Sequence, residues 1–218
     1  MGIIDRLSTL LNLLLPQKCL SCDKIGELLC ESCLYKLPKE QSPYGVTTIF
    51  PYSDPVVRQA IWLLKYRGVN KIVEPLARVV YEKIVEELAD LSELHQNKEK
   101  IIIVPVPLSK ERERERGFNQ TMLLAKEIVR IDSGRSLEFR PDILKKVTDT
   151  PSQVSIKNRA ERIKNLKDAF VLENKTATKN KVVVLLDDVT TTGATLNECA
   201  KVLRRAHPRL IFKLAVAH

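Results

Sequence analysis

The chain has 218 residues, of which 44% are hydrophobic and only 5% aromatic, so it can bury a sizeable core as one main domain with a small appendage. A formal net charge of +9 favours polyanionic partners, although charge alone is a weak functional signal. No apolar run is long enough to cross a bilayer and the opening residues lack the features of a secretory leader, so we expect a cytoplasmic protein without membrane insertion.

The N-terminal region combines an apolar stripe with clustered cysteines. Residues 3–15 have helical periodicity that ends at Pro16, which predicts a packing helix. Two CxxC pairs follow with seven residues between them, a spacing that brings four thiolates around one tetrahedral zinc ion: Cys19, Cys22, Cys30 and Cys33. Two disulfides are the alternative, which a cytoplasmic setting disfavours. Because the protein would fill all four positions, we expect the zinc to be structural.

The next segment predicts a linker, a strand and two helices. Residues 38–45 have linker composition, which divides the chain into an N-terminal module, 1–45, and a main domain, 46–218. A strand is expected at 46–52, a helix from Asp54 to Gly68 and a second helix from Lys71 to about residue 94. The string LLKYRG places Lys65 at the end of the first helix, where snorkelling basic side chains are the ordinary explanation.

The segment 101–125 begins as a strand and then becomes charged. Residues 101–104 predict a buried strand, and the prolines at 105 and 107 predict a rigid loop after it. Arginines alternate with glutamates in this loop, and at helical spacing these charges would pair with one another. A helix carrying Leu123, Leu124 and Ile128 comes next.

The most informative stretch is KVVVLLDDVTTTGATL, residues 181–196. A short apolar run predicts a strand buried on both faces, and two carboxylates are expected where that strand leaves the sheet. A loop rich in threonine, with a single glycine, then opens a helix. Such a loop binds phosphate through backbone N–H groups and hydroxyls, whereas carboxylates accept hydrogen bonds from a vicinal diol. Phosphate at one end and diol at the other describe a ribose 5-phosphate.

The remaining elements predict an α/β fold. Residues 160–166 suit a short helix, and strands are expected at 170–172 and 210–216, the second of them after the helix that carries Cys199, which we expect to be a buried apolar residue. Apolar strands and helices that alternate from residue 101 onward favour a mostly parallel sheet with helices on both faces.

Residues 181–196 resemble the 5-phosphoribosyl-1-pyrophosphate (PRPP) signature of type I phosphoribosyltransferases. The resemblance implies that Asp187 and Asp188 hold the ribose hydroxyls, with Asp188 as a candidate general base. It assigns the 5′-phosphate to the loop formed by Thr190, Thr191, Thr192, Gly193, Ala194 and Thr195. The pyrophosphate of PRPP needs basic side chains and Mg²⁺, for which the candidates are Lys65, Arg112 and Arg116.

Taken together, VPVPLS, RGFNQ, DDVTTTGATL, LKYRG and the CxxC pairs resemble the ComF competence-protein family. Gln153, Arg159, Asn165 and Phe170 also match the pattern of this family. The resemblance implies a zinc finger joined to a type I phosphoribosyltransferase-like domain, with single-stranded DNA and competence or DNA-uptake proteins as partners. Two departures are the acidic residues of the ERERER loop and the insertion at 93–100.

Three functions follow from these patterns. The first is a zinc-containing, PRPP-binding competence protein that handles single-stranded DNA. The second is an active phosphoribosyltransferase with an unidentified acceptor. The third is a regulator that senses PRPP and docks partners through its zinc finger.

Overall fold

The computed structural model describes residues 17–41, 44–67, 70–89, 99–133, 135–148, 166 and 168–218. Three of the predictions above lie outside these ranges. They are the N-terminal helix at 3–15, most of the helix at 160–166, and the positions Gln153, Arg159 and Asn165.

A parallel sheet of five strands forms the centre of the described structure, with the order β1-β7-β6-β2-β3. The strands are β1 (Thr47–Phe50), β2 (Ile101–Pro105), β3 (Leu137–Phe139), β6 (Val182–Val189) and β7 (Leu210–Ala217). Every pairing within this sheet is parallel. This confirms the predicted mostly parallel sheet.

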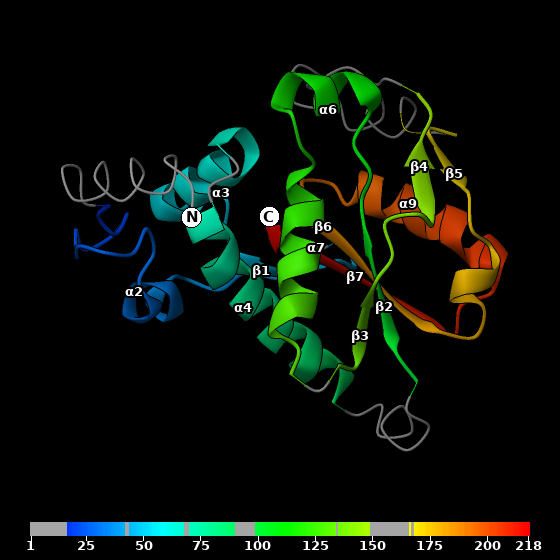
Figure 1. Ribbon diagram of the computed structural model, residues 1–218, viewed down its shortest axis with the longest axis horizontal. Coiled ribbons are helices and arrows are strands. Elements are labelled where there is room, and N and C mark those ends of the chain that lie inside the picture. Colours follow the sequence, from blue (N-terminus) through cyan, green and yellow to red (C-terminus); the bar gives the residue numbers. More distant parts are fainter. Residues whose placement is uncertain are drawn as a thin grey trace, which may run out of the picture.

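Helices cover both faces of the sheet, as the alternation of side chains along its strands requires. The helices are α3 (Pro55–Arg67), α4 (Asn70–Leu88), α7 (Gln120–Ile131) and α9 (Ala194–Leu203), which the 3₁₀ turn η2 (Arg204–Ala206) extends. Val182, Val184 and Leu186 point into the core cluster of α3, α4 and α7, whereas Val183 and Leu185 point into the cluster of α9. In Figure 1 the sheet separates α4 and α7 from α9.

The crossover connections that follow β2 and β6 lead toward opposite edges of the sheet. From β2 it crosses through α7 to β3 at one edge, and from β6 it crosses through α9 to the neighbouring strand β7 on the other side. The carboxyl ends of β2 and β6 therefore lie side by side where the two crossovers diverge. Ligands of open α/β sheets bind at such switch points.

The N-terminal module packs onto the main domain through a shared core. Its residues include the short helix α2 (Glu31–Lys36) and an isolated bridge between Lys18 and Ile25. Leu29 and Leu34 are buried in the same hydrophobic cluster as residues of α4. The segments before and after residue 45 therefore share one hydrophobic core. A domain boundary at this residue stays a prediction.

Several elements differ from the sequence predictions. The loop predicted after Pro107 is instead a helix, α6 (Lys110–Arg116), because Ser109 caps its first turn and Gly117 ends it in a left-handed conformation with φ 77°. The predicted strand β5 (Phe170–Leu172) pairs antiparallel with β4 (Leu144–Lys146) and forms a separate small sheet. Helix α4 ends at Leu88, earlier than expected, while Asp54 caps α3 as predicted.

Candidate functional site

The two acidic residues lie near the carboxyl end of β6, at the switch point, and as neighbours in a strand they point to opposite faces of the sheet. The strand does not end before them, as the sequence predicted, but continues to Val189 because Asp187 and Val189 still pair with Ala215 and Ala217 of β7. Parallel pairing on this side therefore fixes the backbone of both carboxylates within the sheet. Their positions are set by strand geometry and not by a flexible loop.

Asp188 is the centre of a hydrogen-bonded network that joins three helices to β6. Its side chain is buried, with 4% of its surface exposed. Gln120 Nε2, from α7, donates to Asp188 Oδ2 over 2.6 Å, and Lys65 Nζ, from α3, lies 3.4 Å from Asp188 Oδ1. Arg116 Nη1, from α6, donates to Gln120 Oε1 over 3.0 Å. These contacts satisfy a charge that would be costly to bury without a partner.

Asp187 is half-buried and lies next to this network. Burial, followed by the neighbouring charge of Asp188, raises the pKa of Asp187 to about 7, while Lys65 and Lys146 oppose the shift. The N–H of Asp188 donates to Asp187 Oδ1 over 2.8 Å. A carboxyl with a pKa near neutrality can exchange a proton under physiological conditions, which is the property that a general base needs. The assignment of a general base to Asp188 stays a prediction.

The loop after the acidic pair is held in a defined shape. Thr190 is buried, and its N–H donates to the carbonyl of Ala217 over 2.9 Å. Gly193 has a φ of 70°, and a Cβ at this position would lie 3.2 Å from Tyr44 Cβ and 3.3 Å from Val46 Cγ2. Helix α9 begins at the next residue, so the N–H groups of its first turn open toward this loop. This is the geometry of an anion site.

His218 connects the loop to the N-terminal segment. Its Nε2 lies 3.0 Å from the carbonyl oxygen of Thr191, which can only accept, so Nε2 carries the proton in this arrangement. His218 Nδ1 is 3.6 Å from Glu40 Oε1, and its ring packs against Tyr44 at 5.8 Å between centroids. The linker between the two parts of the chain thus supports the predicted phosphate loop.

The predicted pyrophosphate residues divide into two groups. Lys65 and Arg116 are joined to the acidic pair by the contacts described above. Arg112 is half-buried on α6, and its backbone N–H donates to Ser109 Oγ over 3.4 Å. All three assignments stay predictions.

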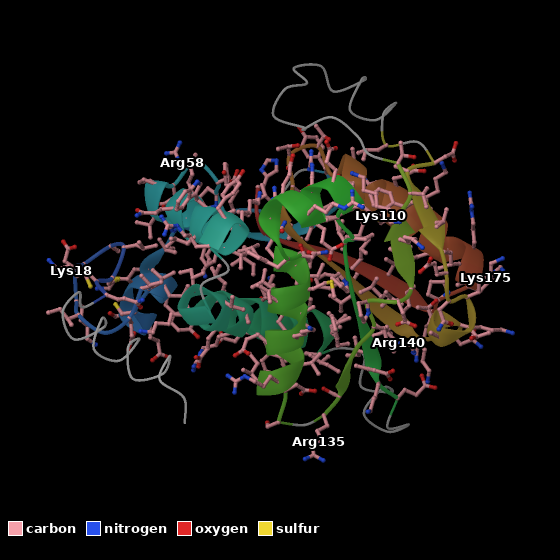
Figure 2. The ribbon with its side chains drawn as sticks, turned by 45° about the horizontal axis from the view of Figure 1, so that its top comes forward. Lys18, Arg58, Lys110, Arg135, Arg140 and Lys175 are labelled. Atoms are coloured by element: carbon pink, nitrogen blue, oxygen red, sulfur yellow. The ribbon has the colours of Figure 1, made fainter. Side chains whose placement is uncertain are left out.

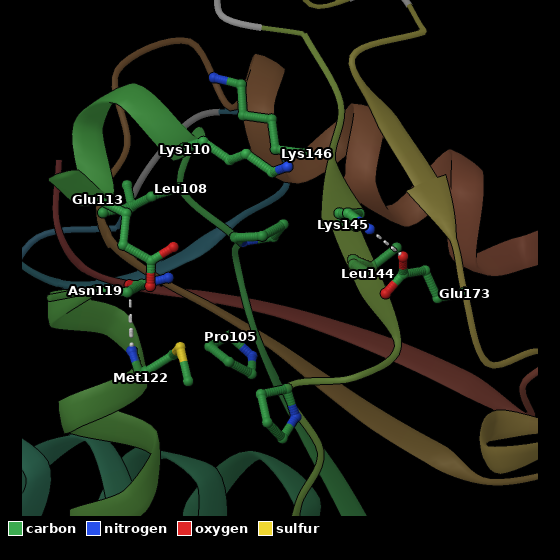
Figure 3. A pocket seen from close by; sticks show the side chains of 12 residues that line it. Pro105, Leu108, Lys110, Glu113, Asn119, Met122, Leu144, Lys145, Lys146 and Glu173 are labelled. Carbon is green, nitrogen blue, oxygen red and sulfur yellow. Dashed lines mark hydrogen bonds and ion pairs between the residues drawn. The ribbon is translucent and has the colours of Figure 1, made fainter.

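A pocket of about 230 Å³ lies between the carboxyl end of β2, helix α6 and the small sheet. Figure 3 shows Lys110 and Lys146 at one end of this pocket and Pro105 and Met122 at the other. The pocket adjoins the acidic pair, since Lys146 is close enough to Asp187 to lower its pKa. It therefore offers space for a second molecule beside the predicted sugar-phosphate site.

The four N-terminal cysteines are brought together, so that all four sulfur atoms lie within 4.8 Å of one another. Cys19 Sγ and Cys22 Sγ are each 3.7 Å from Cys30 Sγ. These separations match the distance of about 3.8 Å between sulfurs on a tetrahedral zinc ion, and they exceed a disulfide bond of about 2.0 Å. The cluster can therefore bind a metal ion through four thiolates. Cys199 is fully buried away from it on α9, as predicted.

Sequence reasoning missed two residues of the site. Gln120 lies within the RGFNQ string, but its hydrogen bond to Asp188 spans 68 residues and has no local signal. His218 reaches the loop only because β7 lies beside β6 in the sheet. Both contacts depend on tertiary structure.

Comparison with known proteins places the chain among sequence relatives. No family model matches it. The chain is 33% identical over 190 residues to "Competence protein F" of Haemophilus influenzae, an alignment that covers 86% of this chain and 78% of the relative. The chain belongs to the competence protein F family. Another relative is "DNA utilization protein YhgH" of Escherichia coli K12, 30% identical over 180 residues, with coverage of 83% and 73%. The resemblance inferred from the motifs is thereby confirmed.

The solved structures that match this competence protein F family member include phosphoribosyltransferases. They include "HGPRT-ase" of Leishmania tarentolae, with 12% identity, coverage of 67% of this chain and 66% of the other, and a TM-score of 0.36. Hypoxanthine phosphoribosyltransferase of Trypanosoma cruzi has 10% identity, coverage of 66% and 65%, and a TM-score of 0.39. Scores of this size add no argument to the family assignment. Among the described helices, none has the length and apolar composition to cross a membrane.

Proposed function

We propose that this chain is a cytoplasmic, zinc-containing protein that binds PRPP with Mg²⁺ and handles single-stranded DNA together with other competence proteins. The observation that carries the proposal is the pairing of Asp187 and Asp188 with the Gly193 loop at the carboxyl edge of the sheet. The acids suit the ribose hydroxyls, and the loop together with the start of α9 suits the 5′-phosphate. Lys65 pairs with Asp188 and Arg116 donates to Gln120, and these two cations near the acidic pair support a pyrophosphate with Mg²⁺ in the same site.

The names of the relatives support the DNA part of this proposal. One relative is called a competence protein and another a DNA utilization protein. The net charge of +9 is compatible with a polyanionic strand. The cysteine cluster supports a structural zinc, because four thiolates leave no coordination position for a substrate.

Fragments of PRPP provide the test of the sugar-phosphate site. A ligand that binds only the folded protein raises its unfolding temperature, and at a fixed ligand concentration the rise grows with the logarithm of the affinity. PRPP with Mg²⁺ is expected to raise the unfolding temperature more than ribose 5-phosphate, and ribose 5-phosphate more than pyrophosphate. Lys65→Ala should reduce the shift with PRPP and leave the shift with ribose 5-phosphate unchanged. Equal shifts with pyrophosphate and PRPP would contradict the assignment of the ribose to Asp187 and Asp188.

An active phosphoribosyltransferase is the second candidate, and the pocket beside the acidic pair is the observation that favours it. In this case an acceptor in the pocket attacks C1′ of PRPP, pyrophosphate leaves, and a carboxylate takes the acceptor's proton. Release of pyrophosphate from PRPP across a panel of bases and amines tests this activity. Release that Asp187→Asn abolishes would support transfer, and no release with any acceptor would count against it.

A further inference from the structure

Helix α3 presents two large aromatic rings to solvent near the sugar-phosphate site. Trp62, the only tryptophan of the chain, is 47% exposed and Tyr66, one turn later, is 57% exposed. Their ring centroids are 5.8 Å apart with an interplanar angle of 39°. The opposite face of the same helix is buried in the core. The two rings therefore form one aromatic surface that is about half exposed to solvent.

Guanidinium groups from two elements lie over these rings. Arg67 Cζ is 5.9 Å from the centroid of Trp62, and Arg116 Cζ, from α6, is 5.5 Å from the centroid of Tyr66. Arg58, one turn before Trp62, is also exposed, and Figure 2 shows it on the outer side of α3. The result is a surface that alternates flat aromatic faces with positive charge.

A purely structural role explains this surface poorly. An aromatic pair at i and i+4 stabilises a helix only slightly. Leaving a tryptophan half exposed forgoes more stabilisation than that, because burial of large apolar side chains is the dominant favourable contribution to folding. Exposed aromatics flanked by arginine suit a ligand that offers both a π-face and negative charge. Successive nucleotides of a single strand have both features, since the bases stack and the phosphates pair with arginine.

We propose that Trp62, Tyr66, Arg67 and Arg116 form a stacking platform for single-stranded nucleic acid. This inference rests on the proposed function and assigns its DNA partner to a surface. Arg116 also donates to Gln120, which donates to Asp188. Lys65, which precedes Tyr66 in the sequence, pairs with the same carboxylate. The platform therefore begins where the sugar-phosphate site ends. A strand bound here would lie beside that site.

The single tryptophan makes the test specific to this surface. Titration of the full chain with oligothymidylate of about 12 nucleotides at low salt should quench Trp62 fluorescence in a saturable way. An abasic strand of equal length and charge should bind more weakly and leave the fluorescence unchanged. Tyr66→Ala should weaken binding of the oligonucleotide about ten-fold, whereas Tyr66→Phe, which keeps the ring, should not.

Arg67→Ala and Arg205→Ala form a matched pair, because each removes one exposed arginine. Arg67→Ala should weaken binding of the oligonucleotide and reduce the quench of Trp62 fluorescence. Arg205→Ala should leave the quench unchanged and weaken binding only as much as the loss of one positive charge does. If fluorescence anisotropy of a labelled strand shows binding but Trp62 is not quenched and Tyr66→Ala binds as tightly as the wild type, the platform is wrong while the DNA partner stands. If the wild type binds no strand at low salt by either method, the DNA part of the proposed function fails and the platform with it.

Discussion

Asp187 links the protonation of the site to the stability of the fold. Its pKa is raised to about 7, first by burial and then by the charge of Asp188, whereas an aspartate in an unfolded chain titrates near pH 4. Between about pH 4 and about pH 7 the folded state therefore binds more protons than the unfolded state. The free energy of unfolding should fall as pH rises through this window, and Asp187→Asn should remove most of that fall.

Urea unfolding at about pH 5 and about pH 8 measures this effect. Asp142 gives a control of opposite sign, since hydrogen bonds from Arg140 hold its pKa well below the usual range. Its contribution is present above about pH 4 and is lost only below that pH, so Asp142→Asn should lower the stability equally at about pH 5 and about pH 8 and leave the fall between them intact. A wild-type fall that Asp187→Asn leaves intact would show that another group causes it.

Gly193 tests how tightly the phosphate loop is fixed. Alanine at this position would adopt an unfavourable φ of 70° and place its Cβ 3.2 Å from Tyr44 Cβ and 3.2 Å from Asn197 Nδ2. A non-glycine residue in the left-handed conformation costs roughly 1–2 kcal/mol. We expect Gly193→Ala to lower the free energy of unfolding by at least this amount. Gly45→Ala is the matched control, because its φ is 63° and its nearest neighbour, Lys213 Nζ, is 3.9 Å away. Equal losses in the two variants would contradict the proposed close packing of the loop.

At the residue scale, the residues of the candidate site could be found in the sequence, but the contacts between them could not. Asp187, Asp188 and Gly193 follow one another in a short stretch, so local sequence carries their signal. Gln120 and His218 join the site through contacts between distant segments, which one sequence does not reveal. The rise in the pKa of Asp187 depends on burial and therefore also required the fold.

The cysteine module is the element whose stability we expect to depend on a bound metal. With metal bound, the four thiolates would hold the segment that carries Leu29 and Leu34 against α4. Removal of metal should raise hydrogen exchange in residues 17–37 and leave the amides of β6 protected. Mass spectrometry before and after a chelator measures both regions in one experiment, and Cys30→Ser should reproduce the chelated pattern. The cysteine variant Cys199→Ser is the control, because Cys199 lies outside the cluster.

Two outcomes would contradict this account of the module. Unchanged zinc content in Cys30→Ser would remove Cys30 from the metal site. Loss of protection in β6 together with the module would show that the two parts unfold as one unit. This would mean that the shared core of Leu29, Leu34 and α4 contributes more to the stability of the module than the bound metal does.

At the element scale, periodicity found the buried strands and the long helices. Strands β2, β6 and β7 are apolar runs, and α3 follows its predicted cap at Asp54. Helix α6 escaped prediction because a run of alternating Glu and Arg has no apolar face, and only its caps at Ser109 and Gly117 define it. The short strands β3 and β4 have too few residues for a periodic signal.

The charge of the whole molecule predicts how DNA binding responds to salt. A chain with a net charge of +9 releases counterions from a strand when it binds, so the logarithm of affinity falls linearly with the logarithm of salt concentration. With about three phosphate contacts, affinity should fall roughly 20-fold between about 50 mM and about 200 mM salt. Arg67→Ala should reduce this slope by the amount that corresponds to about one phosphate contact. A slope near zero would mean that charge does not drive the interaction.

Calorimetric titration of PRPP with Mg²⁺ into the full chain tests the central claim most directly. The control is the variant with both Asp187→Asn and Asp188→Asn, which keeps the volume of the two side chains and removes their charge. We predict saturable binding to the wild type and a loss of roughly 1–3 kcal/mol of binding free energy per charged hydrogen bond in the variant, with the fold retained. No heat of binding with the wild type, or equal affinity in the two proteins, would contradict the assignment of this site to PRPP.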